Sequence, residues 1–233
     1  MISEIELREN YEKVLKNVEL HAKKVSRKPE EIKLVAVTKT QPIDVLKLAL
    51  HVGINILGEN YAQELRDKSK ALSDFNIEWH FIGRIQTNKL KYIVPVANLI
   101  HSVYRLEEIS EIDKIAKKVG KIQNVLLEVN VSGEESKGGV KLEDVREIVV
   151  RGQEFSNVRI IGLMTMAPYI EPEETRKYFR LLREARDYLN KEFPNVVELS
   201  MGMSNDYTVA IEEGSTILRI GTAIFGERLK IKG

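Results

Sequence analysis

Short apolar runs rich in β-branched residues alternate with longer amphipathic segments along the whole chain. Such runs predict strands, and most of them are too apolar for a sheet that is wetted on one face. A parallel sheet covered by helices fits them better. The eight predicted strands span residues 33–39, 56–60, 78–83, 99–103, 124–130, 158–165, 196–201 and 216–221.

The segments between these runs carry apolar residues at three- and four-residue spacing, which indicates amphipathic helices. Residues 106–119, for example, read LEEISEIDKIAKKV. The clearest helical segments are 43–52, 106–119, 142–155 and 173–193. A further helical segment, at about 2–27, precedes the first strand and is expected to be an additional helix.

Eight strands that alternate with helices, without a long insertion, predict an α/β fold of the (β/α)₈ or TIM-barrel type with an extra N-terminal helix. An open doubly wound sheet is the alternative that the pattern leaves open. No linker rich in proline, glycine or serine divides the chain, so residues 1–233 are predicted to form a single domain.

Composition and charge exclude several kinds of binding partner and site. The chain has 233 residues, 43% hydrophobic and 30% charged, and its net charge of +1 gives no field that would attract nucleic acid. The absence of cysteine excludes disulfides and thiolate metal sites. The N-terminal segment is charged throughout and no segment is apolar enough to span a bilayer, so we expect a cytoplasmic protein without a membrane partner.

Functional residues of a (β/α)₈ barrel collect at the C-terminal ends of its strands. Lys39 ends the first run, LVAVTK. A lysine that leaves a strand is most often simply solvated. In an apolar barrel mouth, however, desolvation favours the neutral amine, which suits Schiff-base formation with an aldehyde.

Two glycine-containing segments follow the last two predicted strands. Residues 200–204 read SMGMS and residues 219–226 read RIGTAIFG. Backbone N–H groups and hydroxyls in such turns can bind an anion, and barrels often bind phosphate at the loops after strands seven and eight. Each segment is also an ordinary turn sequence. Their pairing at adjacent strand ends is what favours a phosphate site.

His80 and His101 lie in two of the predicted strands, without an HxH or HExxH spacing or a carboxylate cluster. We therefore expect no metal site. A sulfur-rich set can fill a core or pack against a flat aromatic ring, and its members are Met164, Met166, Met201 and Met203.

Seven blocks occur in an order that is specific when taken together. They are AVTKTQP at 36–42, GENYAQE at 58–64, WHFIGRIQTNK at 79–89, EVNVSGEESKGG at 128–139, GLMTMAP at 162–168, SMGMSNDYTVAI at 200–211 and RIGTAIFG at 219–226. On these blocks the chain resembles the pyridoxal phosphate homeostasis protein family, short relatives of the N-terminal barrel of alanine racemase. Tyr104 and Ile85 depart from the usual residues of the family.

The resemblance implies pyridoxal 5'-phosphate (PLP) as cofactor and a role for each matching position. Lys39 corresponds to the lysine that forms the internal aldimine, and Arg219 to the residue that faces the pyridine nitrogen. The phosphate cup corresponds to Ser200, Gly202, Ser204, Gly221 and Thr222. Residues expected to line the site are Asn60, His80 and Met164.

The chemistry of Arg219 favours a carrier over an enzyme. Arginine cannot accept a proton, so it favours an unprotonated ring nitrogen and weakens the cofactor as an electron sink. Alanine racemase shares this arginine and is still active, but it has a catalytic tyrosine from a second domain of the partner subunit. This chain ends at Gly233, just after the eighth predicted strand, and Tyr207 is only a weak substitute.

We therefore expect a monomeric PLP carrier without robust catalysis, which releases PLP to apo-forms of PLP-dependent enzymes. A racemase-like amino-acid enzyme is the main alternative. A barrel that binds some other phosphate ester is a third.

Overall fold

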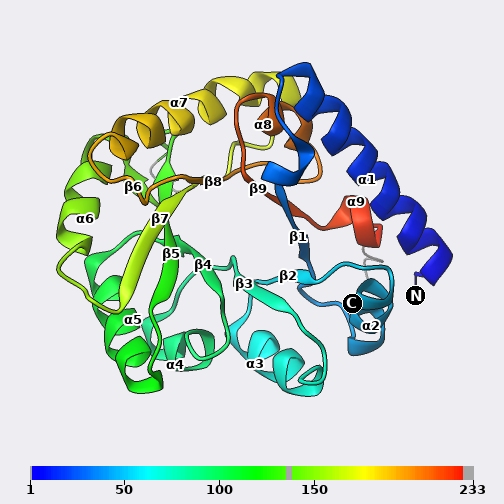
Figure 1. The fold of residues 1–233 in the computed structure, drawn as a ribbon, viewed down its shortest axis with the longest axis horizontal. Coiled ribbons are helices and arrows are strands. Elements are labelled where there is room, and N and C mark those ends of the chain that lie inside the picture. The colour runs from blue at the N-terminus through cyan, green and yellow to red at the C-terminus, as the bar shows by residue number, and fades with distance from the viewer. Residues whose placement is uncertain (1, 135–137, 228–233) are drawn as a thin grey trace.

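Eight parallel strands close into a barrel in the computed structural model, which describes residues 2–134 and 138–227 (Figure 1). Every neighbouring pair is parallel, and the last strand pairs back onto the first through Leu34 and Leu218. The closed ring confirms the predicted (β/α)₈ barrel and excludes the open sheet. In barrel order the strands are β1 (Lys33–Val37), β2 (Ile56–Glu59), β3 (Glu78–Phe81), β4 (Leu99–Val103), β5 (Gln123–Asn130), β7 (Val158–Met164), β8 (Glu198–Ser200) and β9 (Ile217–Ile220).

A short strand, β6 (Val140–Lys141), lies outside this ring and pairs with β5 through Val129 and Val140. It was not predicted, because two residues carry no readable periodicity. It follows the block at 128–139, of which residues 135–137 lie outside the described residues.

Helices surround the barrel (Figure 1). Their bounds are α1 (Glu4–Lys24), α2 (Ile43–His51), α3 (Ala62–Ala71), α4 (Leu90–Ile93), α5 (Leu106–Val119), α6 (Val145–Gly152), α7 (Pro172–Asn190), α8 (Tyr207–Glu212) and α9 (Thr222–Phe225). The helix predicted at 142–155 divides into a 3₁₀ turn, Leu142–Asp144, and α6. None of the helices in the described ranges is long and apolar enough to cross a membrane.

The additional N-terminal helix begins at a defined cap. The Ser3 hydroxyl accepts a hydrogen bond from the backbone N–H of Glu6 at 3.2 Å, which satisfies one of the free donors of the first turn. Its apolar face, including Leu7, Val14 and Val18, is buried. The helix packs beside α8 and α9 (Figure 1), so it supports the segments that follow the last two barrel strands.

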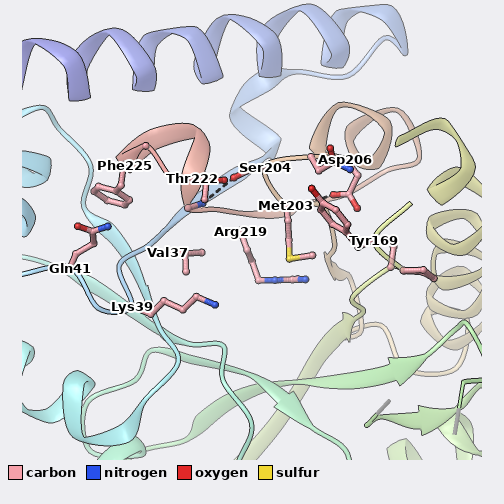
Figure 2. Close-up of a pocket in the computed structure, with 15 residues that line it drawn as sticks. Val37, Lys39, Gln41, Tyr169, Met203, Ser204, Asp206, Arg219, Thr222 and Phe225 are labelled. Carbon is pink, nitrogen blue, oxygen red and sulfur yellow. Dashed lines mark hydrogen bonds between the residues drawn. The ribbon is translucent and has the colours of Figure 1, made fainter. Parts of the chain in front are cut away.

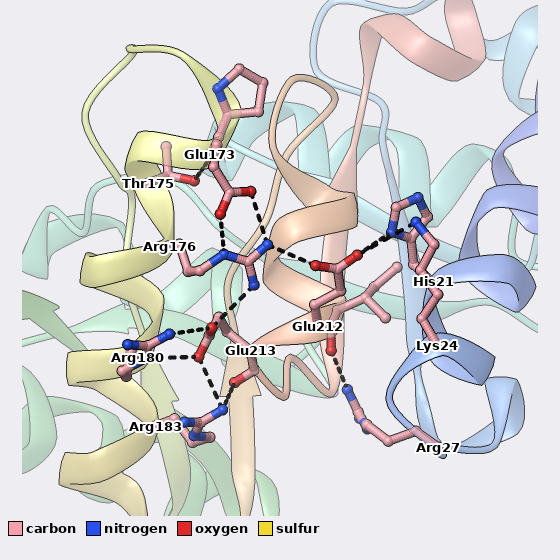
Figure 3. A network of polar contacts seen from close by, with 12 residues as sticks. His21, Lys24, Arg27, Glu173, Thr175, Arg176, Arg180, Arg183, Glu212 and Glu213 are labelled. Atoms are coloured by element: carbon pink, nitrogen blue, oxygen red, sulfur yellow. Dashed lines mark hydrogen bonds and ion pairs between the residues drawn. The ribbon is translucent and has the colours of Figure 1, made fainter.

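An ionic network fastens α8 to α1 and α7 (Figure 3). Glu212 of α8 pairs with His21 of α1 at 2.7 Å and with Arg176 of α7 at 2.7 Å. The neighbouring Glu213 pairs with Arg176 at 3.1 Å and with Arg183 at 3.0 Å. Because α8 follows the loop after β8, these contacts restrain a loop at the C-terminal end of the barrel.

The barrel has two apolar layers. The larger one lies between strands and helices and includes Ala36, Leu218 and Phe179. The smaller one is a separate cluster of Val35, Leu99, Leu126, Met164 and Ile217. Because strand side chains alternate, Val35 and Ile217 point away from the helix-facing Ala36 and Leu218, into the barrel. Arg219 shares the inward face of β9 with Ile217 and lies two residues closer to the strand's C-terminal end.

Candidate functional site

A cavity of about 400 Å³ opens at the C-terminal end of the barrel strands. Its volume is within the range of small-molecule sites. The residues that line it are Val37, Lys39, Gln41, Ala167, Pro168, Tyr169, Met203, Ser204, Asn205, Asp206, Arg219, Gly221, Thr222, Phe225 and Gly226. They lie at the C-terminal ends of β1 and β9 or in the segments after β1, β7, β8 and β9, and thus meet from four separate parts of the sequence.

The first wall of the cavity is the segment after β1. The strand ends at Val37, two residues earlier than the predicted run, although the N–H of Thr38 still bonds to the carbonyl of Gly58 at 2.9 Å. Thr40 then turns the chain with a φ of 63°. Lys39 lies between these two threonines, and its amino end points into the cavity towards Arg219 (Figure 2).

The opposite wall joins the loops after β8 and β9. The Ser204 hydroxyl oxygen accepts hydrogen bonds from the backbone N–H groups of Gly221 at 3.3 Å and Ala223 at 3.2 Å. Ser204 can then donate its own hydroxyl hydrogen to a ligand. Thr222 adds a second hydroxyl beside it (Figure 2). This wall presents small polar groups of the kind that bind an anion.

Arg219 forms the floor between the two walls (Figure 2). Its guanidinium donates to the Thr165 carbonyl at 2.9 Å and to the Ser200 hydroxyl. Burial lowers the pKa of Arg219 to about 10, so it remains charged at neutral pH. The carboxyl groups of Asp206 and Glu128 attract the Arg219 guanidinium electrostatically. Burial raises the pKa of Asp206, and it raises the pKa of Glu128 to about 7.

A buried polar chain links Arg219 to the N-terminal end of the barrel. Ser200 contacts His101 Nδ1 at 2.8 Å, and His101 Nε2 contacts His80 Nδ1 at 2.9 Å. His80 Nε2 contacts Glu78 at 2.9 Å. Burial lowers the pKa of both histidines, whereas the hydrogen bond with His80 lowers the pKa of Glu78 to about 2. The chain therefore joins two neutral imidazoles to a carboxylate.

The two end groups, Arg219 and the Glu78 carboxylate, determine the direction of every hydrogen bond in this polar chain. Arg219 can only donate, so Ser200 accepts from it and donates to His101 Nδ1. The Glu78 carboxylate can only accept, so neutral His80 carries its hydrogen on Nε2. His101 must then donate from Nε2 to His80 Nδ1. The two ends require the same tautomers, and this consistent arrangement holds the Ser200 oxygen as an acceptor for Arg219.

Five residues predicted for the site line this one cavity, namely Lys39, Ser204, Arg219, Gly221 and Thr222. Ser200 and Gly202 lie behind it. Ser200 is fully buried against Arg219. Gly202 has a φ of +98°, and its carbonyl accepts the Arg219 N–H at 3.0 Å. An added Cβ at position 202 would lie 2.6 Å from the Cβ of Ala210, so glycine is required there.

The remaining predicted residues lie elsewhere. His80 is buried in the polar chain, and Met164 belongs to the cluster inside the barrel. Asn60 lines a separate cavity of about 240 Å³, together with Arg84 and Lys89.

Other lining residues were not predicted for the site. Asp206, Tyr169 and Phe225 lie within or directly beside the sequence blocks after β8, β7 and β9, which is the signal that could have indicated them. Tyr169 is 91% exposed at the mouth. Tyr207, considered above as a base, is not among the lining residues. Its hydroxyl instead accepts a hydrogen bond from Asn17 of α1 at 2.8 Å.

A closed barrel with a lysine after its first strand and small polar groups after its last two strands places the chain in the class of the alanine racemase N-terminal domain. Residues 10–229 match the family model for the alanine racemase N-terminal domain. Alanine racemase from Clostridium difficile 630 has the same fold, with a TM-score of 0.73 at 17% identity, over 97% of this chain and 57% of that one.

Comparison with curated proteins narrows the class further. The pyridoxal phosphate homeostasis protein of Aquifex aeolicus is 48% identical over 223 residues, which cover 94% of this chain and 97% of the relative. The Escherichia coli K12 protein of the same name is 36% identical, over 94% and 95% of the two chains. The chain belongs to the pyridoxal phosphate homeostasis protein family, as its sequence blocks predicted.

Two solved structures are also similar over nearly their whole length. A protein of unknown function from Bifidobacterium adolescentis has a TM-score of 0.91 at 32% identity, over 97% of this chain and 98% of that one. PipY of Synechococcus elongatus, solved with PLP bound, has a TM-score of 0.80 at 32% identity, over 90% and 100% of the chains.

Proposed function

We propose that this protein binds PLP in the cavity between Lys39 and Ser204, and serves intracellular PLP homeostasis. The observation that carries the proposal is the meeting of a lysine amine, a buried arginine and an anion-binding wall around one cavity. The names of the relatives and the PLP-bound structure of PipY support it.

The residues of the cavity fit each part of PLP. Lys39 points inward from the first wall, where its amine would form a Schiff base with the aldehyde. Ser204 and Thr222 would bind the phosphate on the opposite wall. Arg219, on the floor between them, would face the pyridine nitrogen. When bound, PLP would supply an aldehyde that exchanges reversibly between amines.

Arg219 also supports a carrier role over catalysis. A guanidinium that is charged at neutral pH cannot take a proton from a ring nitrogen, and an unprotonated ring is the weaker electron sink. Racemisation further requires an acid and a base on opposite faces of the substrate. Among the described lining residues, Lys39 supplies an amine and Tyr169 supplies the phenol on which a racemase-like alternative would depend.

We propose further that the protein is a cytoplasmic monomer that releases PLP to apo-forms of PLP-dependent enzymes. All the residues proposed to hold PLP, namely Lys39, Ser204, Arg219 and Thr222, belong to this chain, so the proposed site needs no residue from a partner subunit. Light scattering at micromolar concentration would test the monomer, and a stable dimer would contradict it.

Loading, transfer and turnover measured together test the function. Purified protein is loaded with PLP, freed of excess cofactor and mixed with a PLP-free aminotransferase, whose recovered activity reports transfer. A parallel chiral assay follows alanine and serine. We expect slow reactivation and no useful racemisation. Turnover well above about 1 s⁻¹, the low end of ordinary enzymes, would favour the racemase-like alternative. Substitution Tyr169→Phe would then show whether this phenol is the second base.

A further inference from the structure

A buried ionic cluster lies against the segment that carries Lys39. Its members are Lys68 and Glu64 of α3 and Glu59 at the end of β2. Lys68 is only 6% exposed, and its amine donates to Glu59 at 2.7 Å and to Glu64 at 2.6 Å. Lysine is almost never so buried unless it is paired. The Lys68 amine and the two carboxylates are therefore held in one fixed arrangement.

The cluster binds the backbone on both sides of Lys39. The third hydrogen bond from the Lys68 amine goes to the carbonyl of Thr38 at 2.8 Å. The Thr38 hydroxyl donates to Glu59 at 2.6 Å. On the other side, the backbone N–H of Thr40 donates to Glu64 at 2.8 Å. One set of side chains thus restrains both residues adjacent to Lys39.

The backbone at this point needs such restraint. Thr40 has a φ of 63°, a region that β-branched residues rarely occupy. Two hydrogen bonds hold this turn: the Thr40 N–H donates to Glu64, and the Gln41 N–H donates to the Thr38 carbonyl at 3.0 Å, so loss of Glu64 would remove one of the two restraints. Apolar packing of α3 by Ala62 and Leu65 already attaches this helix to the barrel. A buried ion pair stabilises a protein weakly compared with apolar side chains, so attachment alone does not account for the cluster.

We propose that Lys68, Glu59 and Glu64 are positioning residues, which hold the 38–40 backbone so that the Lys39 amine points into the cavity. The inference rests on the proposed function in one respect, namely that Lys39 is the residue that PLP modifies. None of the three residues lines the cavity, so the cluster would act on Lys39 through the backbone.

The first experiment needs no PLP, so it separates failure of this inference from failure of the proposed function. Amide hydrogen exchange over residues 38–41 is compared in the unmodified protein, Lys68→Met and Glu64→Ala. Lys70→Met is the matched control, because Lys70 is an exposed residue of the same helix. We expect exchange roughly tenfold faster or more in both test variants, as for a locally opened segment, and no change in the control.

The second experiment measures the reaction of Lys39 itself. Each variant is incubated with PLP and borohydride, and the fraction of modified Lys39 is followed by mass spectrometry. We expect the rate in Glu64→Ala to fall about fivefold or more, and Glu64→Gln, which keeps an acceptor oxygen, to recover most of it. Thr40→Gly tolerates a positive φ, so adding it to Glu64→Ala should restore part of the rate.

The outcomes discriminate the positioning role from a structural one. Faster exchange without slower modification would show that the cluster stabilises the segment but does not position Lys39, and would overturn the proposal. Unchanged exchange and modification in Glu64→Ala would also overturn it. If Lys68→Met does not fold, the comparison of Glu64→Ala with Glu64→Gln still tests the positioning role. The Glu64 side chain is partly exposed, so its removal disturbs the core less.

Discussion

The two walls of the cavity are held by different kinds of interaction. Behind Lys39, a buried lysine and two carboxyl groups bind the backbone. On the opposite wall, the Ser204 hydroxyl binds two backbone N–H groups, and the fixed shape of the loop depends on glycine at position 202. One wall is thus organised by charge and the other by neutral dipoles and close packing.

The difference corresponds to what each wall is proposed to bind. A single reactive amine needs a fixed direction, which buried ionic hydrogen bonds can impose on the backbone. A phosphate needs several donors and tolerates no uncompensated carboxylate nearby. Asp206, which lies beside this wall, has one carboxylate oxygen engaged by the backbone N–H of Met203 at 2.7 Å. Its negative charge is further compensated by attraction to Arg219.

The largest expected effect concerns the wall that contains Ser204 and Thr222. Replacing Ser204 and Thr222 together by alanine removes the two hydroxyls that we propose as donors to the phosphate. Charge-assisted hydrogen bonds contribute roughly 1.5–3 kcal/mol each, so PLP should bind roughly tenfold or more weakly, as measured by absorbance titration. Pyridoxal, which lacks the phosphate, should bind the two proteins alike. A control substitution at exposed Ser156 should change neither affinity. Equal affinity of the unmodified protein for pyridoxal and PLP would contradict this role of the wall.

A smaller effect tests the charges around Arg219. The pKa of Glu128 is raised to about 7, so the folded state holds a proton that the unfolded state loses near its ordinary value of 4.5. This contribution to stability is present below pH 4.5 and is lost as the pH rises through 7. The loss is on the order of 3 kcal/mol.

Replacing Glu128 by glutamine should remove this pH dependence. Urea unfolding at pH 5, 6, 7 and 8 should therefore show a flatter stability profile in the variant. Glutamine at the exposed Glu154 is the control and should leave the profile unchanged. A profile that keeps its slope in Glu128→Gln would show that other groups cause it.

The smallest effect tests the polar chain beneath Arg219. Ser200→Ala removes an acceptor for Arg219 and a partner for His101, and should lower the free energy of unfolding by about 1–2 kcal/mol. Nitrogen NMR should find both His80 and His101 protonated on Nε2 in the unmodified protein. In Ser200→Ala the tautomer of His101 is no longer fixed from this side. Observation of the Nδ1 tautomer in the unmodified protein would contradict the assigned direction of the chain.

The fold could be predicted almost completely from the sequence. All eight barrel strands were predicted to within two residues at each end, because apolar runs separated by amphipathic helices leave few arrangements. The short elements β6, α4 and α9 were not predicted, since two to four residues show no period. The end of β1 was placed too late because the turn at Thr40 depends on tertiary contacts with α3.

The site could be predicted only in part. Strand ends predicted that Lys39, Ser204, Arg219 and Thr222 lie close together, and all four line one cavity, since the C-terminal ends of parallel strands meet at one face. The depth of a side chain within the barrel could not be inferred from the sequence. Ser200 was therefore predicted to line the site, whereas it lies behind Arg219 and does not line the cavity. The cluster around Lys68 was also missed, because its partners come from two elements and become neighbours only after folding.

Covalent trapping tests most directly whether Lys39 holds PLP. The protein is loaded with PLP, reduced with borohydride, digested and mapped by mass spectrometry, beside Lys39→Ala treated in the same way. We expect absorbance typical of a Schiff base before reduction, and the mass of reduced PLP on Lys39 alone. Lys39→Ala should lose the label while it keeps weak PLP binding through Ser204 and Thr222. A label on another lysine, with Lys39 unmodified, would contradict the account.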